Sequence, residues 1–268
     1  MTEAFDVRAD VYLATTGHAR SREAARVLIC AGLVTLDGRR ITKPSQPVDD
    51  SAEHSVTVEQ SRENRYVSRG GLKLEAALEA AQLDVTGLRC ADIGASTGGF
   101  TDCLLKHGAS QVFALDSGHG QLDRKLASDA RVVNIEGFNA RRLCDDDRGG
   151  LPDYLDMAVM DVSFISQTYI LPGVPSILRP GGLSVSLIKP QFEVGRAGLG
   201  KGGIVRDFGR RLEAVMRVMS CADSAGLGFV RLLRSPIEGG DGNREYLLVS
   251  RKGAAAPYPS AGGIAEII

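Results

Sequence analysis

One segment constrains the fold of this chain more than any other: Ala91-Asp-Ile-Gly-Ala-Ser-Thr-Gly-Gly-Phe-Thr101. An apolar run over 88–93 stops at three glycines within six positions, and Phe100, Leu104 and Leu105 then resume at helical spacing. The pattern predicts a strand, a glycine-rich turn and a helix, which expose backbone N–H groups near the partial positive charge of the helix start. An ordinary first turn of an α/β sheet is the alternative.

The glycine-rich turn lacks both common phosphate signatures. A dinucleotide site requires G-x-G-x-x-G and a phosphate loop requires G-x-x-x-x-G-K-[ST], whereas this turn reads G-A-S-T-G-G-F, without lysine. Asp92, at the end of the strand, would repel a pyrophosphate but attract an ammonium group such as that of an amino acid. We therefore predict a site for S-adenosyl-L-methionine that is formed by Asp92, Gly94, Ala95, Ser96, Gly98, Gly99 and Phe100.

Composition narrows the class of protein. The 268 residues are 43% hydrophobic, which suits one large or two modest globular domains. The five cysteines are scattered without a C-x-x-C pair and the four histidines lack ligand spacing, so we expect neither disulfides nor a metal site. No apolar run is long enough to span a membrane and the N-terminus does not resemble a signal peptide, so we expect a cytoplasmic protein. We also expect the protein to be a monomer in solution. With a net charge of −1, nucleic-acid binding would depend on local patches.

Residues 1–60 differ in pattern from the rest. Residues 11–13 suggest a first helix, Ser21 is a candidate N-cap for a second helix, and Asp37-Gly38 predicts a hairpin turn after a strand over 33–36. The segment carries a local excess of cations, which could either contact the phosphates of a nucleic acid or form a solvated face. The candidate RNA-binding residues are Arg8, Arg20, Arg22, Arg26, Arg39, Arg40 and Lys43.

This N-terminal pattern resembles a known RNA-binding domain. The strings Arg8-Ala-Asp-Val-Tyr-Leu13, Gly17-His-Ala-Arg-Ser-Arg-Glu23, Ile29-Cys-Ala-Gly-Leu-Val34 and Lys43-Pro44 are similar to the S-four-type domain of ribosomal proteins and pseudouridine synthases. The resemblance implies a small α+β domain whose helix and hairpin bind structured RNA by shape and backbone charge.

Strands and helices alternate beyond a polar, glycine-containing linker over 61–71. Strand-like runs cover 89–93, 111–116, 132–135, 157–161 and 183–188, which predicts a parallel sheet with both faces covered over 72–252. The runs 229–235 and 245–250 flank a flexible connection over 239–243, and such an antiparallel pair is typical of a class I, Rossmann-like methyltransferase. Residues 253–268 form a C-terminal tail, and its first part over 253–263, rich in Ala, Pro and Gly, is expected to be loosely ordered.

Polar residues after the second and third strands are candidates for an adenosine pocket, because ligands of open α/β sheets bind beyond the carboxyl ends of the strands. Asp116 could accept hydrogen bonds from the ribose hydroxyls, with Ser117 and Gly118 beside it, although a helix N-cap is the simpler interpretation. Asn139 could line the adenine pocket.

Charged residues at further strand ends suggest the reacting half of a site. Asp161 ends the fourth strand and Lys189 the fifth, Glu245 begins the last, and Lys73 opens the apolar helix over 72–83. Structural ion pairs and solvated charges are the simpler interpretation. Burial of such groups is costly, however, and is tolerated where chemistry requires it.

These four residues complete a second resemblance. Lys73, Asp161, Lys189 and Glu245 follow the order of the Lys-Asp-Lys-Glu tetrad of FtsJ-like RNA ribose 2′-O-methyltransferases. With the strings Ser68-Arg-Gly-Gly-Leu-Lys73, Asp161-Val-Ser-Phe-Ile-Ser166, Lys189-Pro-Gln-Phe-Glu-Val-Gly195 and Gly242-Asn-Arg-Glu-Tyr246, nearly the whole chain resembles the TlyA-type family. It departs from the family pattern at His119, where a tyrosine or similar residue often stands, and at Tyr66, where some members carry tryptophan.

The resemblance implies an S-adenosylmethionine-dependent enzyme that methylates the 2′-hydroxyl of a cytidine in ribosomal RNA of ribosomal subunits. We expect Lys189 to act as a charged hydrogen-bond donor to the attacking oxygen and Asp161 to orient it, because carboxylates on both sides favour the ammonium form. The alternatives are a membrane-lytic protein, suggested by the haemolysin label of the family, and a non-catalytic RNA-binding assembly factor. The sequence does not specify which ribosomal subunit is modified.

Overall fold

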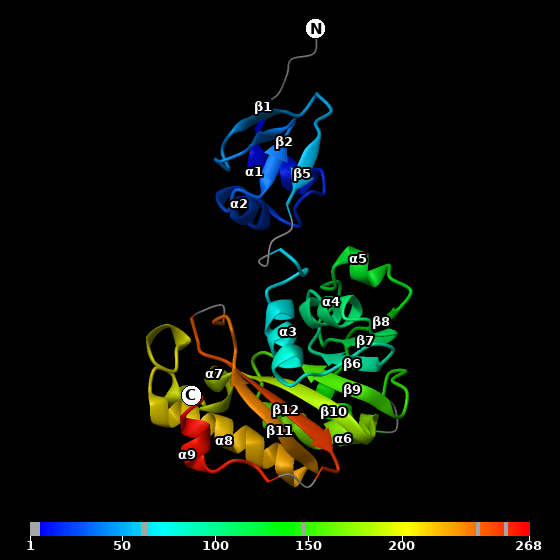
Figure 1. Cartoon of the computed structure of the whole chain (residues 1–268), viewed down its shortest axis with the longest axis vertical. Coiled ribbons are helices and arrows are strands. Elements are labelled where there is room, and N and C mark those ends of the chain that lie inside the picture. Colours follow the sequence, from blue (N-terminus) through cyan, green and yellow to red (C-terminus); the bar gives the residue numbers. More distant parts are fainter. Residues whose placement is uncertain (1–5, 60–63, 146–147, 240–241, 255–256) are drawn as a thin grey trace. The chain divides into compact units, whose positions relative to one another are not determined.

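The computed structural model describes residues 6–59, 64–145, 148–239, 242–254 and 257–268. Its internal contacts divide the chain into two compact units, Met1–Arg65 and Tyr66–Ile268. Figure 1 labels their helices and strands. Each unit is described by itself below.

The first unit is a small α+β domain with its own apolar core. Helices α1 (Ala9–Thr15) and α2 (Arg22–Cys30) pack beside two small sheets. One sheet pairs β1 (Asp6–Arg8) with β4 (Pro47–Asp49), a pairing that the sequence analysis did not predict. The other has the order β3 (Arg39–Arg40), β2 (Val34–Leu36), β5 (Val56–Val58).

The predicted helix cap and hairpin turn of the first unit are both present. The Ser21 hydroxyl accepts a hydrogen bond from the Ala24 amide at 3.2 Å, which confirms the N-cap of α2. Asp37 and Gly38 both adopt positive φ values, 50° and 76°, as a two-residue hairpin turn with the twist of its strands requires. The turn thereby presents β3 and its two arginines beside β2.

The second unit is built on a seven-stranded sheet with the order β11-β12-β10-β9-β6-β7-β8. All neighbouring pairs from β10 to β8 are parallel, whereas β12 runs antiparallel to both β10 and β11. This confirms the predicted class I methyltransferase architecture, including the antiparallel strand at one side. The strands are β6 (Arg89–Ile93), β7 (Gln111–Leu115), β8 (Val132–Ile135), β9 (Leu155–Met160), β10 (Leu178–Ile188), β11 (Leu227–Arg234) and β12 (Tyr246–Lys252).

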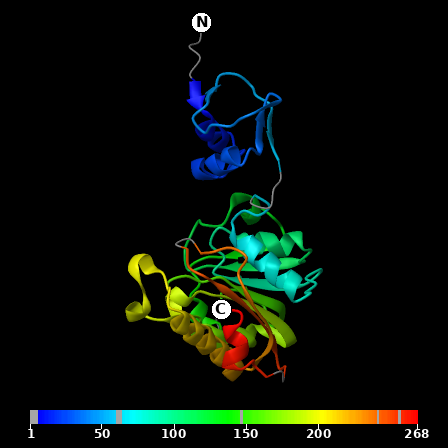
Figure 2. The same cartoon turned by 60° about the vertical axis from the view of Figure 1, so that its left-hand side comes forward.

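Helices cover both faces of this sheet, as the two views in Figures 1 and 2 show. One face packs against α3 (Gly70–Ala80), α4 (Gly99–Lys106) and α5 (Arg124–Ala127), and the other against α6 (Val174–Ile177), α8 (Phe208–Ser224) and α9 (Ala261–Ala265). Because neither face is exposed, the strands are apolar on both sides. The short α7 (Pro190–Glu193) follows directly after β10.

The boundary between the units, after Arg65, falls inside the expected linker over 61–71, but the second part of that linker is packed against α3. Residues 61–63 lie outside the described residues, whereas Tyr66 is only 5% exposed and its hydroxyl donates to Glu75 Oε1 at 2.8 Å. A Cβ at Gly71 would lie 2.3 Å from Tyr66 Cγ, so the ring rests directly on the backbone of α3. Residues 66–71 therefore pack within the second unit, because an aromatic ring in the linker finds an apolar surface there.

The expectation of loose order over 253–263 is wrong at residues 260–263, where α9 begins. Ser260 caps α9, and Ile264 and Ile268 are buried in the sheet's apolar core. The Tyr246 hydroxyl also donates to the Ile268 carbonyl at 3.3 Å. Scattered apolar residues in a segment of low propensity are sufficient for ordering, because they cover a sheet face that would otherwise be exposed. The positions 255–256 and 240–241 of the predicted tail and hairpin lie outside the described residues.

Candidate active site

The glycine-rich turn after β6 is shaped by close packing as much as by any ligand. Gly94 has a φ of +82°, and a Cβ there would lie 2.9 Å from Val162 Cγ1. Gly98 has a φ of +93°, and a Cβ would lie 2.3 Å from Leu126 Cδ1. At Gly99, the first residue of α4, a Cβ would lie 2.1 Å from Ser68 Oγ. Larger residues at these positions would move the turn off the sheet or separate α3 from α4.

Asp92 lies beneath this turn, fully buried. Its Oδ2 accepts hydrogen bonds from the backbone amide and the hydroxyl of Thr101, at 2.8 and 2.7 Å. Its Oδ1 is buried without a hydrogen-bond partner within the described structure. Burial, together with the charges of Asp161 and Asp116, raises the pKa of Asp92 to about 7, although the bonds from Thr101 oppose that shift. Asp92 thus holds the start of α4 and keeps one unsatisfied acceptor.

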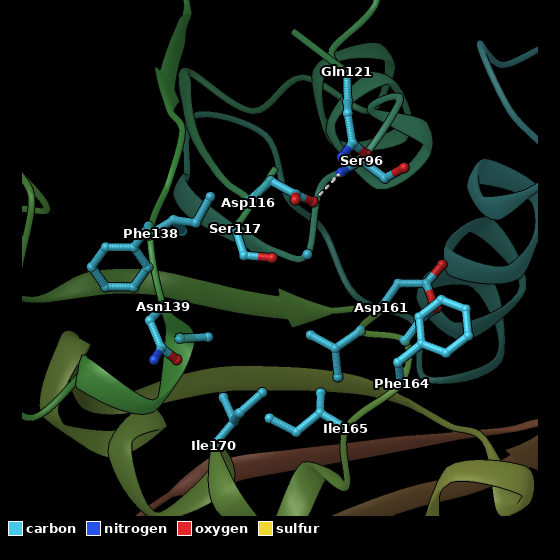
Figure 3. Close-up of a pocket in the computed structure, with 15 residues that line it drawn as sticks. Ser96, Asp116, Ser117, Gln121, Phe138, Asn139, Asp161, Phe164, Ile165 and Ile170 are labelled. Atoms are coloured by element: carbon cyan, nitrogen blue, oxygen red, sulfur yellow. Dashed lines mark hydrogen bonds between the residues drawn. The ribbon is translucent and has the colours of Figure 1, made fainter. Parts of the chain in front are cut away.

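Asp116, directly after β7, organises the neighbouring loop. Its Oδ2 accepts from the Ser96 amide at 2.8 Å, the contact drawn in Figure 3, and its Oδ1 accepts from the Gly118 amide at 2.7 Å. Ser96 itself has a positive φ of 49°, a conformation that the bond to Asp116 helps to maintain. Each carboxylate oxygen keeps a lone pair for a further donor.

A cavity of about 360 Å³ opens at the carboxyl ends of β6, β7 and β9. Figure 3 shows Asp116 and Ser96 on one side of it, with Asp161 and Phe164 across from them. The volume suits a nucleoside-sized ligand. The lining residues are Gly94, Ser96, Leu115, Asp116, Ser117, Gln121, Phe138, Asn139, Ala140, Asp161, Val162, Ser163, Phe164, Ile165 and Ile170.

Only part of the predicted donor site reaches this cavity. Gly94, Ser96, Asp116, Ser117 and Asn139 line it. The other predicted residues do not belong to the lining and lie behind it or in the adjoining turns: Asp92, Ala95, Gly98, Gly99, Phe100 and Gly118.

The sequence analysis missed the apolar walls of the cavity, Phe138, Ile165 and Ile170, and the polar side chain of Gln121. No local pattern distinguishes these residues from core or surface positions. Asn139 also has a structural role, since its Oδ1 caps a 3₁₀ turn by accepting from the Arg141 amide at 3.1 Å.

The four predicted tetrad residues form two ion pairs. Lys73 Nζ lies 2.5 Å from Glu245 Oε2, with side-chain exposures of 10% and 3%. Lys189 Nζ lies 2.7 Å from Asp161 Oδ1 and donates a hydrogen bond to Ser163 Oγ at 2.8 Å. Gln191, two residues after Lys189, donates weakly to Glu245 Oε1 at 3.4 Å.

Sheet topology explains how these distant residues meet. Ile188 of β10 lies opposite Tyr246 of β12 in an antiparallel pair, so Lys189 and Glu245 leave the sheet at the same end. The Asp161 amide donates to the Ile93 carbonyl at 3.0 Å, which places Asp161 beside the glycine-rich turn. Helix α3, which carries Lys73, contacts β12.

Comparison with known proteins agrees with this geometry. The family model described as FtsJ-like methyltransferase matches residues 66–252, and the one described as S4 domain matches residues 7–54. The chain belongs to the FtsJ-like methyltransferase family. The predicted fold and family resemblance are thereby confirmed.

Within this family, the chain is similar both to proteins named as rRNA methyltransferases and to proteins named as hemolysins. It is 44% identical over 241 residues to the 16S/23S rRNA (cytidine-2′-O)-methyltransferase TlyA of Mycobacterium tuberculosis, covering 90% of this chain and 88% of that protein. It is 43% identical to Hemolysin A of Brachyspira hyodysenteriae, covering 90% and 98%. A solved structure from Streptococcus thermophilus, named as a candidate hemolysin, is 40% identical with a TM-score of 0.72, covering 98% and 94%. TlyA and Hemolysin A are the same family, so the second name does not mark a different fold.

The FtsJ-like unit also presents an exposed aromatic side chain at the mouth of its cavity. Phe164 is 92% exposed and has a positive φ of 64°, a rare conformation for a bulky residue. Its ring lies 5.2 Å from that of Phe192, and Lys189 Nζ lies 5.9 Å from the Phe192 ring centre. Strained, exposed residues of this kind concentrate at functional sites.

The predicted RNA-binding residues of the S4 unit fall into two classes: cations that are paired with a carboxylate and cations that are exposed without an ion pair. Arg8 donates through Nε and Nη2 to the fully buried Asp10, both at 2.9 Å, and Arg22 lies 3.6 Å from the same carboxylate. Arg26 and Arg40 are paired with Glu23 and Glu59 at 3.7 and 3.5 Å. Arg20, Arg39 and Lys43 are exposed and have no ion pair among the described residues.

Two further properties concern the expectations about a membrane span and a metal site. In the described parts of the chain, no helix has the length and apolar character needed to cross a bilayer. Within those same parts, no group of three or more His, Cys, Asp or Glu side chains is arranged to hold a metal ion.

Proposed function

We propose that this protein transfers a methyl group from S-adenosylmethionine to the 2′-hydroxyl of a cytidine in ribosomal RNA. The observation that carries the proposal is the pair of Lys-carboxylate contacts, Lys189–Asp161 and Lys73–Glu245, beside a nucleoside-sized cavity. A purely structural role does not require two nearly buried lysines, one directly after β10 and one in α3, that are both paired with carboxylates.

The cavity suits the methyl donor chemically. Asp116 offers carboxylate oxygens for the ribose hydroxyls, and Phe138, Ile165 and Ile170 offer apolar walls for a flat base. In this proposal the amino-acid part of the donor lies against Gly94 and Ser96 of the glycine-rich turn, whereas Asp92, buried behind the lining, holds the start of α4 through Thr101. When bound, the donor supplies a methyl group that is already activated on a sulfonium.

The residues of the chain then have to position the acceptor and manage one proton. In the transfer, the O2′–CH₃ bond forms as the S–CH₃ bond breaks, the sulfur keeps the electron pair, and the hydroxyl proton leaves to solvent. Lys189, paired with Asp161, donates a hydrogen bond to the attacking oxygen and stabilises its developing negative charge. Ser163 fixes the direction of that ammonium through the bond from Lys189 Nζ.

The S4 unit supplies affinity for RNA in this proposal. Arg20, Arg39 and Lys43 are exposed, and cations of this kind bind the phosphate backbone without reading sequence. The name of the Mycobacterium tuberculosis relative mentions both 16S and 23S rRNA, and the substrates of this chain belong to the same class in our proposal.

The test is to map 2′-O-methyl groups on both rRNAs after incubating unmodified ribosomal subunits with the protein and S-adenosylmethionine. We expect a methylated cytidine ribose at one or more defined positions. Methylation of a base atom, or of neither rRNA, would contradict the proposal. An Asp161→Asn preparation is the matched control, since activity that survives this change would come from a contaminating enzyme.

A further inference from the structure

Glu193 is a buried carboxylate close to the tetrad that the proposed reaction does not use. It is the last residue of α7, four positions after Lys189, and it is 3% exposed. Its charge faces no Lys or Arg side chain at ion-pair distance in the described structure, although Arg217 donates to its backbone carbonyl at 2.6 Å. The charge of Arg217 lowers the pKa of Glu193 only in part, and the carboxylate oxygens themselves have no ion pair among the described residues, so other contacts must offset their desolvation.

The carboxylate of Glu193 instead binds the segment that follows β9. Its Oε2 accepts from the Ser166 hydroxyl at 2.5 Å, and its Oε1 accepts from the Gln167 amide at 2.9 Å. The Ser166 oxygen also accepts from the Thr168 amide at 3.2 Å, which caps the 3₁₀ turn Gln167–Tyr169. One side chain thus fixes the far end of the segment 161–166.

The near end of that segment carries the reacting groups. Asp161 and Ser163 both contact Lys189 Nζ, and the Phe164 ring packs on Phe192. The two loops after β9 and β10 are therefore joined at both ends, at the tetrad through Lys189 and at the base through Glu193.

We propose that Glu193 is a positioning residue that holds the segment 161–166 against the segment 189–193, so that Asp161 and Ser163 stay in register with Lys189. The inference rests on the proposed methyl transfer. It adds a requirement for length and acceptor geometry at position 193, because the two donors, Ser166 Oγ and Gln167 N, must be reached at once.

Two substitutions distinguish a positioning role of Glu193 from a role of its charge. Glu193→Gln keeps the length of the side chain and an acceptor for the Gln167 amide, whereas Glu193→Asp keeps the charge but is one methylene too short. Burial also raises the pKa of Glu193, so a neutral replacement of equal size relieves a desolvation cost and is not expected to destabilise the fold.

The experiment compares Glu193→Gln, Glu193→Asp and Glu193→Ala by single-turnover methyl transfer, by binding of S-adenosylhomocysteine, and by hydrogen–deuterium exchange of peptides covering 161–169. We expect the Asp and Ala variants to lose ~10- to 100-fold in kcat, because a displacement of about 1 Å has effects of that size. Their 161–169 peptides should exchange faster, while Gln stays within a few-fold of wild type in both measurements. Affinity for S-adenosylhomocysteine should change less than kcat, because residues 161–165 form only one side of the cavity, whereas Gly94, Asp116 and Asn139 are not held by Glu193.

Glu213→Ala, which removes an exposed carboxylate from α8, is the matched control and should resemble wild type. The inference is overturned if Asp replaces Glu193 without loss while Gln does not, if kcat is unchanged in all three variants, or if exchange over 161–169 is unaffected. The exchange measurement needs no RNA substrate, so it can refute the assignment of Glu193 even where the proposed rRNA reaction itself fails.

Discussion

Lys189 Nζ lies 2.7 Å from Asp161 Oδ1, although 28 positions of sequence separate the residues. Both follow parallel, adjacent strands, and Ser163 takes a hydrogen bond from the same ammonium at 2.8 Å. The contact places a fixed positive charge at the edge of the cavity, where an alkoxide-like oxygen would develop.

Replacement of Lys189 by alanine should abolish methyl transfer while leaving donor binding nearly intact. Lys189 does not belong to the cavity lining, whereas Asp161 does. We expect kcat to fall by ~10²-fold or more, the usual effect of removing a group that stabilises the transition state. Calorimetric titration with S-adenosylhomocysteine should give a Kd within a few-fold of wild type. Loss of methyl transfer and donor binding together would refute the assignment of Lys189 to the attacking oxygen. The control is Lys125→Ala, which removes an exposed lysine from α5.

The Lys73–Glu245 pair should behave as a buried unit. Removing either partner leaves an uncompensated charge in a site where both side chains are at least nine-tenths buried, so Lys73→Met or Glu245→Gln should each cost about 3 kcal/mol of unfolding free energy. The double variant should lose less than the sum of the two. Urea unfolding of all four proteins measures this coupling, and strictly additive losses would argue against a direct interaction.

Asp92 should make the stability of the ligand-free protein depend on pH. Its pKa is raised to about 7 by burial first and by Asp161 and Asp116, whereas an unfolded aspartate titrates near ~3.9. Between these values the unfolded chain has lost the proton that the folded protein keeps, so the free energy of unfolding should fall as pH rises from ~4 to ~7, by up to ~1.4 kcal/mol per pH unit.

Urea unfolding at several pH values, with Asp92→Asn and the exposed control Asp223→Asn, measures this dependence. Asp92→Asn should flatten the slope and the control should not. An unchanged slope in Asp92→Asn would show that another group is responsible.

Phe164→Ala should affect RNA and not the fold. The side chain is 92% exposed, so the melting temperature should change little, but stacking of a nucleobase on an aromatic ring contributes about 1–3 kcal/mol. We therefore expect at least a ~5-fold loss in kcat/KM for rRNA and no change in donor affinity. Tyr154→Ala is a close control, because Tyr154 is 64% exposed and also has a positive φ, 63°, but does not line the cavity. Equal effects of the two changes would contradict a specific role.

The cations of the S4 unit should separate into binding and structural residues. Arg39→Ala with Lys43→Ala should weaken rRNA binding and reduce its salt dependence by about one unit per lost phosphate contact, with an unchanged melting temperature. Arg8→Ala should instead lower the melting temperature of this unit, because Arg8 supplies the hydrogen bonds that satisfy buried Asp10. Arg231→Ala in β11 is the control, and binding measured over a salt series is the readout.

Short-range features of the protein followed from the sequence because neighbouring residues carry the information. The bounds of β6 were predicted residue for residue, since an apolar run ends there at Gly94, and Ser21 marked the start of α2 through its own side chain. The boundary after Arg65 falls inside the predicted linker over 61–71, but the packing of residues 66–71 and the helix Ala261–Ala265 in the tail were not predicted. Tyr66 packs on α3 a few residues further along, but this contact depends on how the linker folds back on the helix, and Ile268 lies in a core formed by residues far away in the chain. No local pattern encodes such contacts.

The candidate site likewise combines features that the sequence predicts with features that only tertiary contacts decide. By itself, the sequence determined which residue types follow the parallel strands, and therefore the choice of Asp116, Asp161 and Lys189, because parallel strands deliver their carboxyl ends to one edge. Glu245, which precedes the last strand, was chosen through the resemblance to the FtsJ-like tetrad. Only the tertiary structure decided that the lysines pair as Lys73–Glu245 and Lys189–Asp161, that Asp92 lies behind the cavity, and that Glu193 joins two loops. Pairing, burial and unsatisfied acceptors depend on distances of a few ångströms between segments far apart in sequence, and strand register and helix packing set those distances.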